Sequence, residues 1–318
     1  MEQRYLGRTG LKVSRLGLGT LTWGRDTDEH EAREQLAAFT EAGGTLLDTA
    51  AGYGDGASEE LLGSLLGDVV RREDVVIATK AGITRARGVR ETNASRGFLL
   101  STLDASLRRL RVDHVDLWQV HTWVDDTPLE ETLSALDHAV ASGRAAYVGV
   151  SNYTGWQSAQ AATWQRAVPG RAPLASTQVE YSLLNRRVEA EILPAAAALG
   201  LGVLPWSPLG RGVLTGKYRS GTPADSRAAS PHFASFVGAY LDDRSSRVVE
   251  AVVRAAEGLE WTPVEVALAW VRDRVGVTAP ILGARTAAQL KGALSVEQCV
   301  LPPEIVAALD DVSAPAAS

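Results

Sequence analysis

The sequence has little cysteine, and it has no long uninterrupted apolar run. Its single cysteine, Cys299, excludes an intramolecular disulfide, and we expect it to be a small buried residue rather than a nucleophile. The longest apolar stretch, 192–206, contains two prolines and two glycines, which is wrong for a spanning helix. The first ten residues show no apolar segment of the signal-peptide type. We therefore expect a cytoplasmic protein without a membrane partner.

Lysine is also scarce. Four lysines stand against 28 arginines, and the formal net charge is -6. With no run of basic residues, the sequence lacks the electrostatic footprint of a nucleic-acid-binding protein. Lys80 lies in an otherwise apolar segment, and lysine can be buried and pKa-tuned in ways that arginine cannot. Lys80 is therefore a candidate functional residue.

The composition is that of a globular protein able to bury a sizeable core, with 45% hydrophobic and 22% charged residues. Short Val-, Ile- and Leu-rich runs alternate with amphipathic stretches, which is the pattern of strand–helix units around a parallel sheet. Eight such units predict an α/β fold, the (β/α)8 TIM barrel, as a single domain over residues 1–318. The eight predicted strands are 16–19, 45–48, 75–79, 115–120, 146–150, 175–180, 202–206 and 278–282.

Local signals indicate where some elements begin. The segments 4–6 and 12–14 flank a Thr-Gly turn and predict an N-terminal β-hairpin that closes the barrel floor. Ser95, Thr127 and Thr262 precede periodic runs, the last two with proline following, and we expect each to cap a helix. The Gly-, Pro- and Ser-rich segment 207–240 predicts a long functional loop.

Four polar residues follow three adjacent predicted strands. Asp48 ends the second, Lys80 follows the third and His121 follows the fourth, while Tyr53 lies in a Gly-rich turn after Asp48. Taken singly, they could be a helix cap, a surface lysine, a core histidine and a rim aromatic. Because barrel active sites collect at the carboxyl ends of the strands, we expect the four to face one mouth.

Reduction of a carbonyl needs such a set, because an acid must protonate the oxygen while a hydride reaches the carbon. A tyrosine with a pKa near ~10 needs nearby positive charge to act at neutral pH, and Lys80 supplies that charge. Asp48 would keep a buried Lys80 protonated. His121 would donate a hydrogen bond to the substrate oxygen and orient it toward Tyr53.

Long motifs over nearly the whole chain resemble those of the aldo-keto reductases. They run from GRTGLKVSRLGLGT through LLDTAAGYGDGASEELLG, VVIATKAG, DLWQVHTW, YVGVSNYTGW, TQVEYSLLNR and PWSPLGRGVLTGKY to ILGARTAAQL. The resemblance implies that the catalytic tetrad of the family falls on Asp48, Tyr53, Lys80 and His121. It also implies NADPH (NADP+) as cofactor. No GxGxxG follows a predicted strand, which disfavours a Rossmann site.

The resemblance implies cofactor contacts from the later strands. Ser151, Asn152 and Gln178 would hold the carboxamide and Trp206 would stack on the nicotinamide, although these residues also suit an N-cap, a strand-end polar group and core packing. The implied contacts near the first two strands and the pyrophosphate are Gly19, Thr20, Leu21, Asp48, Ser207, Pro208, Leu209, Gly210, Gly212 and Lys217. Those implied around the adenosine 2'-phosphate are Gly283, Arg285, Thr286 and Gln289, with Arg227 as a second cation.

The sequence departs from the family where Gly292 and Ala293 replace a frequent Glu-Asn pair, so the preference for the 2'-phosphate rests mainly on Arg285. Trp23 and Trp123 are expected to line the substrate pocket with Tyr53 and His121. No residues have metal-ligand spacing, so we expect no metal. The pattern leaves the oligomeric state and the carbonyl substrate open.

The sequence thus predicts an NADPH-dependent carbonyl reductase. One alternative is an NADPH-binding sensor or accessory subunit resembling the potassium-channel beta subunits, which look to have asparagine where His121 stands. Another is a different barrel enzyme, a lyase or isomerase, in which the segment from Trp206 to Lys217 would have no role.

Overall fold

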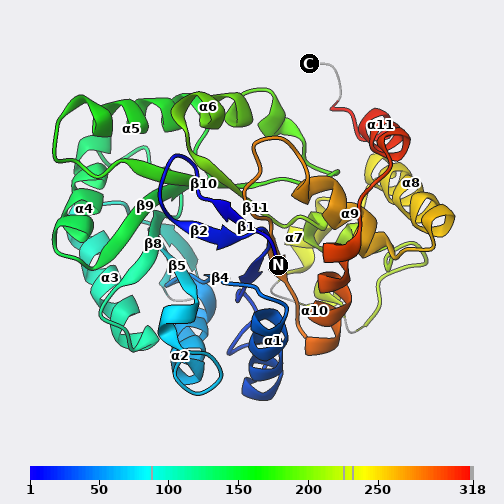
Figure 1. Ribbon diagram of the computed structural model, residues 1–318, viewed down its shortest axis with the longest axis horizontal. Helices are drawn as coiled ribbons and strands as arrows, with labels where there is room; N and C mark the ends of the chain where they lie inside the picture. The colour runs from blue at the N-terminus through cyan, green and yellow to red at the C-terminus, as the bar shows by residue number, and fades with distance from the viewer. Residues whose placement is uncertain (87–88, 225, 231–232, 316–318) are drawn as a thin grey trace.

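A parallel barrel forms the centre of the computed structural model, which describes residues 1–86, 89–224, 226–230 and 233–315 (Figure 1). Within those ranges eight strands pair in the order β11-β10-β9-β8-β5-β4-β3-β12. The strands are β3 (Gly17–Gly19), β4 (Leu46–Asp48), β5 (Val76–Ala81), β8 (Val115–Val120), β9 (Ala145–Ser151), β10 (Leu174–Glu180), β11 (Gly202–Trp206) and β12 (Ile281–Gly283). A bridge between Val203 and Val277 brings the two edges together, so the predicted TIM barrel is confirmed.

Amphipathic helices surround the barrel (Figure 1). The longer ones are α1 (Glu29–Glu41), α2 (Ala57–Leu65), α3 (Arg96–Leu110), α4 (Leu129–Ala141), α5 (Gly155–Ala167), α6 (Ile192–Leu199), α8 (Asp243–Leu259), α9 (Pro263–Arg272), α10 (Ala287–Leu294) and α11 (Pro303–Val312). Their buried leucines, valines and alanines join the outward side chains of the strands in one large apolar cluster. In the described part of the chain, no helix has both the length and the apolar character needed to cross a membrane.

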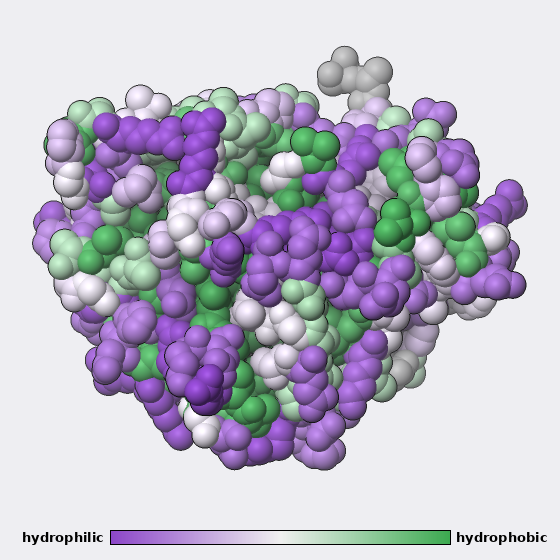
Figure 2. Space-filling model, in the orientation of Figure 1, coloured by the Kyte–Doolittle hydropathy of each residue, from purple (hydrophilic) through white to green (hydrophobic). Residues whose placement is uncertain are grey.

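The N-terminal hairpin covers one end of the barrel. β1 (Gln3–Tyr5) pairs antiparallel with β2 (Lys12–Ser14), and the hairpin lies across the strands in Figure 1. Leu6 and Val13 are fully buried against barrel side chains that include Leu46, Leu117 and Leu204. The predicted floor is therefore confirmed. Seen from this side, the surface is mostly hydrophilic, with hydrophobic residues in small separate groups (Figure 2).

Two of the three residues predicted to begin helices, Thr262 and Ser95, occupy the N-cap position. Thr262 caps α9 with a capping box and Pro263 follows at the first turn, whereas Ser95 precedes α3 without a capping side-chain hydrogen bond. The prediction at Thr127 was wrong by one residue. Pro128 adopts an extended backbone, with ψ of 131°, and is itself the N-cap of α4.

The last strand is shorter than predicted and one hairpin was not predicted. The amides of Thr278 and Ala279 both donate to the carbonyl of Val203, so regular pairing with β3 begins only at Ile281. An antiparallel hairpin, β6 (Ile83–Ala86) with β7 (Val89–Thr92), follows β5. The loop predicted over 207–240 contains a 3-10 segment (Gly210–Thr215) and the short helix α7 (Ala234–Gly238).

Candidate active site

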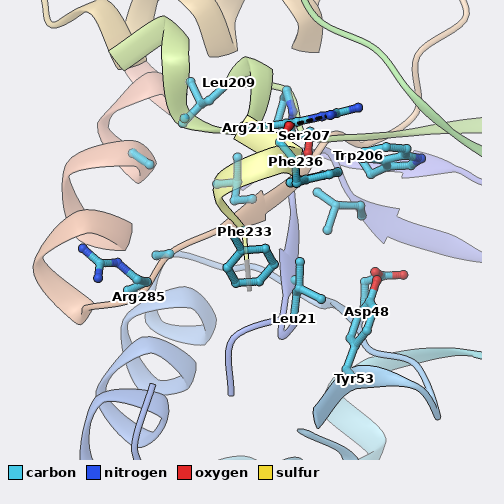
Figure 3. Close-up of a pocket in the computed structure, with 18 of the residues that line it drawn as sticks. Leu21, Asp48, Tyr53, Trp206, Ser207, Leu209, Arg211, Phe233, Phe236 and Arg285 are labelled. Atoms are coloured by element: carbon cyan, nitrogen blue, oxygen red, sulfur yellow. Dashed lines mark hydrogen bonds between the residues drawn. The ribbon is translucent and has the colours of Figure 1, made fainter. Parts of the chain in front are cut away.

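A cavity of about 930 Å³ opens at the carboxyl ends of the barrel strands (Figure 3). It is lined by residues that end or follow five of these strands: Gly19, Asp48, Ser151, Trp206 and Gly283. Parallel strands bring their carboxyl ends to one edge, which is why residues far apart in sequence meet here. The floor hairpin lies at the other end of the barrel.

A buried ion pair joins strands β4 and β5. Lys80 Nζ lies 2.7 Å from Asp48 Oδ2 and 2.7 Å from the carbonyl oxygen of Thr49, and it donates to both. Both side chains are almost fully buried. Burial alone would lower the pKa of Lys80, but the Asp48 carboxylate, the adjacent Tyr53 phenol and the hydrogen bonds to both outweigh it, and the net pKa is raised. Lys80 is therefore a cation at neutral pH.

Tyr53 lies beside this cation. Lys80 Nζ is 3.4 Å from Tyr53 Oη and 5.0 Å from the centre of its ring. Burial raises the pKa of Tyr53 above its ordinary value, the charge of Lys80 opposes that rise, and Asp48 adds to it. Lys80 thus lowers the pKa of the phenol, as expected, but burial raises that pKa by more. Tyr53 is therefore protonated at neutral pH, as a proton donor must be.

His121 completes the group predicted from the sequence. Its ring meets the ring of Tyr53 edge-on, with centroids 5.9 Å apart, and both residues line the cavity. Burial lowers the pKa of His121 well below its ordinary value, and the charges of Lys80 and Arg90 act in the same direction. The imidazole is therefore neutral at pH 7, and it can donate only one ring N–H.

The strand ends of β9, β10 and β11 form a connected hydrogen-bond network. Gln178 Nε2 donates to Asp48 Oδ1 at 2.8 Å, and Ser151 Oγ donates to the carbonyl oxygen of Gln178 at 2.9 Å. Trp206 Nε1 donates to Asn152 Oδ1 at 3.0 Å, and the Asn152 amide in turn donates to the carbonyl oxygen of His121. All four residues line the cavity beside Asp48.

The segment after β11 bends sharply along the cavity. Ser207, Gly210, Arg211 and Gly212 all have positive φ. Ser207, Pro208, Leu209, Gly212 and Lys217 line the cavity as expected, whereas Gly210 is buried beneath the segment, where a Cβ would approach Leu184 Cδ1 to 2.6 Å. Such close approach and left-handed backbone explain why this stretch is rich in glycine.

The far end of the cavity lies at the start of α10. Gly283, Arg285 and Gln289 line it, and so do Gly292 and Ala293. In Figure 3, Arg285 lies on the opposite side of the cavity from Asp48 and Tyr53.

Some of the predicted cofactor contacts have other roles. Thr286 caps α10 by accepting from the Gln289 amide, and it does not line the cavity. The amide of Ala287 donates to Glu31 Oε2 at 2.5 Å. Thr20 is fully buried and its hydroxyl bonds to Ser58, while its neighbours Gly19 and Leu21 face the cavity. The side chain of Arg227 lies outside the described part of the chain.

The two tryptophans expected at the substrate do not line this cavity. Trp23 is fully buried in the core, and its ring N–H donates to Gln35 Oε1. Trp123 packs edge-on against Tyr153 and Trp156, and its ring N–H donates to Asp125. Their proximity in sequence to cavity residues was a poor guide, because adjacent residues leave a strand end in different directions.

Several cavity residues were missed by the sequence analysis. Phe233 and Phe236 come from α7 and the turn before it, and Phe233 lies centrally in the cavity in Figure 3. Phe236 stacks on Trp206 with ring centroids 6.3 Å apart. Arg211 and Arg90 also line the cavity. The sequence predicted a functional loop over 207–240, which contains both phenylalanines, but it did not single out either residue. No sequence pattern indicated Arg90.

Comparison with known proteins agrees with this geometry. The sequence model of the Aldo/keto reductase family matches residues 15–314. The chain is 39% identical to the uncharacterized oxidoreductase YrpG of Bacillus subtilis (strain 168), over 98% of this chain and 96% of that protein. It is 35% identical to a probable voltage-gated potassium channel subunit beta of Oryza sativa subsp. japonica, with the same coverage of 98% and 96%.

A further relative is the L-glyceraldehyde 3-phosphate reductase of Escherichia coli (strain K12), which is 33% identical over 92% of this chain and 86% of that protein. The family match and these relatives extend over nearly the whole chain. The protein belongs to the aldo/keto reductase family of oxidoreductases.

Proposed function

We propose that the protein uses NADPH to reduce aldehyde or ketone carbonyls to alcohols, with Tyr53 as general acid. The observation that carries the proposal is the position of Lys80, 2.7 Å from Asp48 Oδ2 and 3.4 Å from Tyr53 Oη. A protonated phenol beside a fixed cation can release its proton to a carbonyl oxygen, because the cation stabilises the phenolate that forms.

The other two residues have distinct roles in this proposal. The carboxylate of Asp48 keeps Lys80 charged in a buried position. Neutral His121 donates its ring N–H to the carbonyl oxygen and directs that oxygen toward Tyr53. Asp48 and His121 thus position the groups between which the proton moves.

The residues of the cavity fit a dinucleotide cofactor. Polar groups of Ser151, Asn152 and Gln178 would hold the carboxamide end, and Lys217 and Arg285 would face the phosphates. The left-handed backbone at Gly210, Arg211 and Gly212 bends this segment along the cavity, where the pyrophosphate would lie. When bound, NADPH would supply the hydride.

A second candidate function is that of an NADPH-binding sensor or accessory subunit. The similarity to a probable voltage-gated potassium channel subunit beta favours it. The Tyr53 phenol beside the Lys80 ammonium and the neutral imidazole of His121 favour the reductase, because cofactor binding alone does not need either group. The two functions differ in whether the Tyr53 hydroxyl takes part in chemistry.

Tyr53→Phe tests the proposal, since it removes one oxygen and keeps the ring. We expect kcat with a carbonyl substrate to fall on the order of 10²- to 10⁴-fold, while the Kd of NADPH stays within about twofold. Tyr147→Phe is the control, because Tyr147 packs at the floor of the barrel. An unchanged kcat in Tyr53→Phe would remove Tyr53 from the mechanism. A wild type that binds NADPH tightly but reduces no carbonyl would favour the sensor.

A further inference from the structure

The unpredicted β6–β7 hairpin brings a cation to the catalytic end of the cavity. Ile83 from β6 and Arg90 from β7 both line the cavity, together with His121 and Thr122. The hairpin begins just after Lys80, so its position is fixed by the strand that carries the buried ion pair. The positive charge of Arg90 contributes to lowering the pKa of His121, which agrees with its location near the reacting end.

Arg90 differs from the other cations around the cavity. Arg211 is held by both carboxylate oxygens of Glu180, at 2.8 and 2.7 Å. Lys217 and Arg285 belong to the part of the cavity that would face the cofactor phosphates. The side chain of Arg90 is exposed, and no ion pair or side-chain hydrogen bond joins it to the residues that the structure describes.

The surroundings of Arg90 suit a small substrate with an acidic group. Among the described residues that line the cavity, Asp48 is the one carboxylate, and its charge is already balanced by Lys80. Thr122 adds a hydroxyl, and Ile83 adds an apolar wall. The chain as a whole has a net charge of -6, so its overall charge does not attract anions. An unpaired guanidinium at this position would attract an anion locally, because its planar N–H groups can form two parallel hydrogen bonds with a carboxylate or a phosphate.

We propose that Arg90 is a specificity-determining residue that binds the anionic group of the substrate, so that the preferred substrates are carbonyl compounds bearing a carboxylate or a phosphate. This inference rests on the proposed reductase function. The anionic group would contact Arg90 and Thr122 while the carbonyl oxygen lies between Tyr53 and His121.

Three para-substituted benzaldehydes test the proposal: 4-carboxybenzaldehyde, its neutral isostere 4-formylbenzamide, and 4-formylphenyl phosphate. We expect Arg90→Gln to lower kcat/KM for the preferred anionic aldehyde on the order of tenfold and to leave that for the amide within about twofold. The two anionic substrates distinguish carboxylate from phosphate. Arg254→Gln, which removes an exposed arginine of α8, is the control and should change none of the three.

The outcomes separate this inference from the proposed function. Equal losses for charged and neutral aldehydes in Arg90→Gln, or no loss at all, would overturn the role of Arg90 while leaving the reductase intact. If none of the three is reduced, the proposed function fails, and calorimetric binding of terephthalate to the protein loaded with NADPH then decides on the anion site. Affinity about tenfold lower in Arg90→Gln supports the site, and equal affinity refutes it.

Discussion

Gln178 donates a hydrogen bond from Nε2 to Asp48 Oδ1 at 2.8 Å, although the two residues are 130 positions apart in sequence. Lys80 occupies the other carboxylate oxygen, Oδ2, at 2.7 Å. Both oxygens of this buried carboxylate are therefore satisfied, one by a cation and one by an amide. The arrangement links the expected cofactor end of the cavity to Tyr53 through Asp48 and Lys80.

Removing the charge of Asp48 should destabilise the fold. In Asp48→Asn the buried ammonium of Lys80 loses its counter-charge, and we expect the free energy of unfolding at pH 7 to fall by about 3 kcal/mol or more. Urea denaturation measures it. Asp104→Asn breaks a partly exposed ion pair with Arg144 and should cost about 1 kcal/mol or less. Equal losses in the two variants would show that the buried pair contributes little.

His121 should make stability depend on pH below neutrality. Because burial lowers its folded-state pKa well below the ordinary value of about 6.5, the unfolded chain binds this proton first as the pH falls. The contribution of neutral His121 to the free energy of unfolding is fully present above about pH 6.5. It is lost as the pH drops from there toward the folded-state pKa.

His121→Asn removes this dependence. Between about pH 6.5 and pH 5, the free energy of unfolding of the wild type should fall more steeply than that of the variant, by up to about 1.4 kcal/mol per pH unit. Urea denaturation across this range checks it, with His138→Asn as the control on an exposed helix position. Parallel curves for wild type and His121→Asn would contradict the buried neutral imidazole.

Arg285 should set the preference for NADPH over NADH. Arg285→Ala removes a cation at the far end of the cavity, and we expect NADPH affinity to fall by about ten- to a hundredfold while NADH affinity changes little. Fluorescence titration with both cofactors measures the ratio. Lys291→Ala removes a cation of α10 that pairs with Glu34 and should leave the ratio unchanged. An unchanged ratio in Arg285→Ala would refute the assignment.

The Arg211–Glu180 pair should control how fast the cofactor leaves. Arg211 binds Glu180 through two hydrogen bonds, donates to the carbonyl oxygen of Phe236 at 2.6 Å and lies over its ring, and the Tyr240 hydroxyl donates to Glu180. Glu180→Gln weakens this anchor of the α7 segment. We expect NADPH dissociation to accelerate on the order of tenfold in stopped-flow measurements. Glu250→Gln, which breaks an exposed pair with Arg219, is the control, and identical rates in both variants would exclude the anchor.

Strand periodicity predicted the barrel, and the position of Asp48, Lys80 and His121 after consecutive strands predicted that they would share one mouth. That inference works because the side chain at a strand end has few directions available. The same reasoning was wrong for Trp23. This residue follows its strand by four residues, and the intervening turn directs its side chain into the core. The placement of Phe233 and Arg90 depends on loop conformation and on contacts between distant segments, which no local pattern encodes.

The apolar layer under the active site has a consequence for proton supply. Leu46, Leu117 and Leu204 fill the barrel below the ion pair, and the N-terminal hairpin covers them with Leu6 and Val13. These apolar side chains separate the ion pair from the hairpin side, and none of them carries a group that could pass on a proton. On the proposed mechanism we therefore expect Tyr53 to be reprotonated from the same mouth through which substrate enters, so that each catalytic cycle would depend on water returning to that mouth after the alcohol departs.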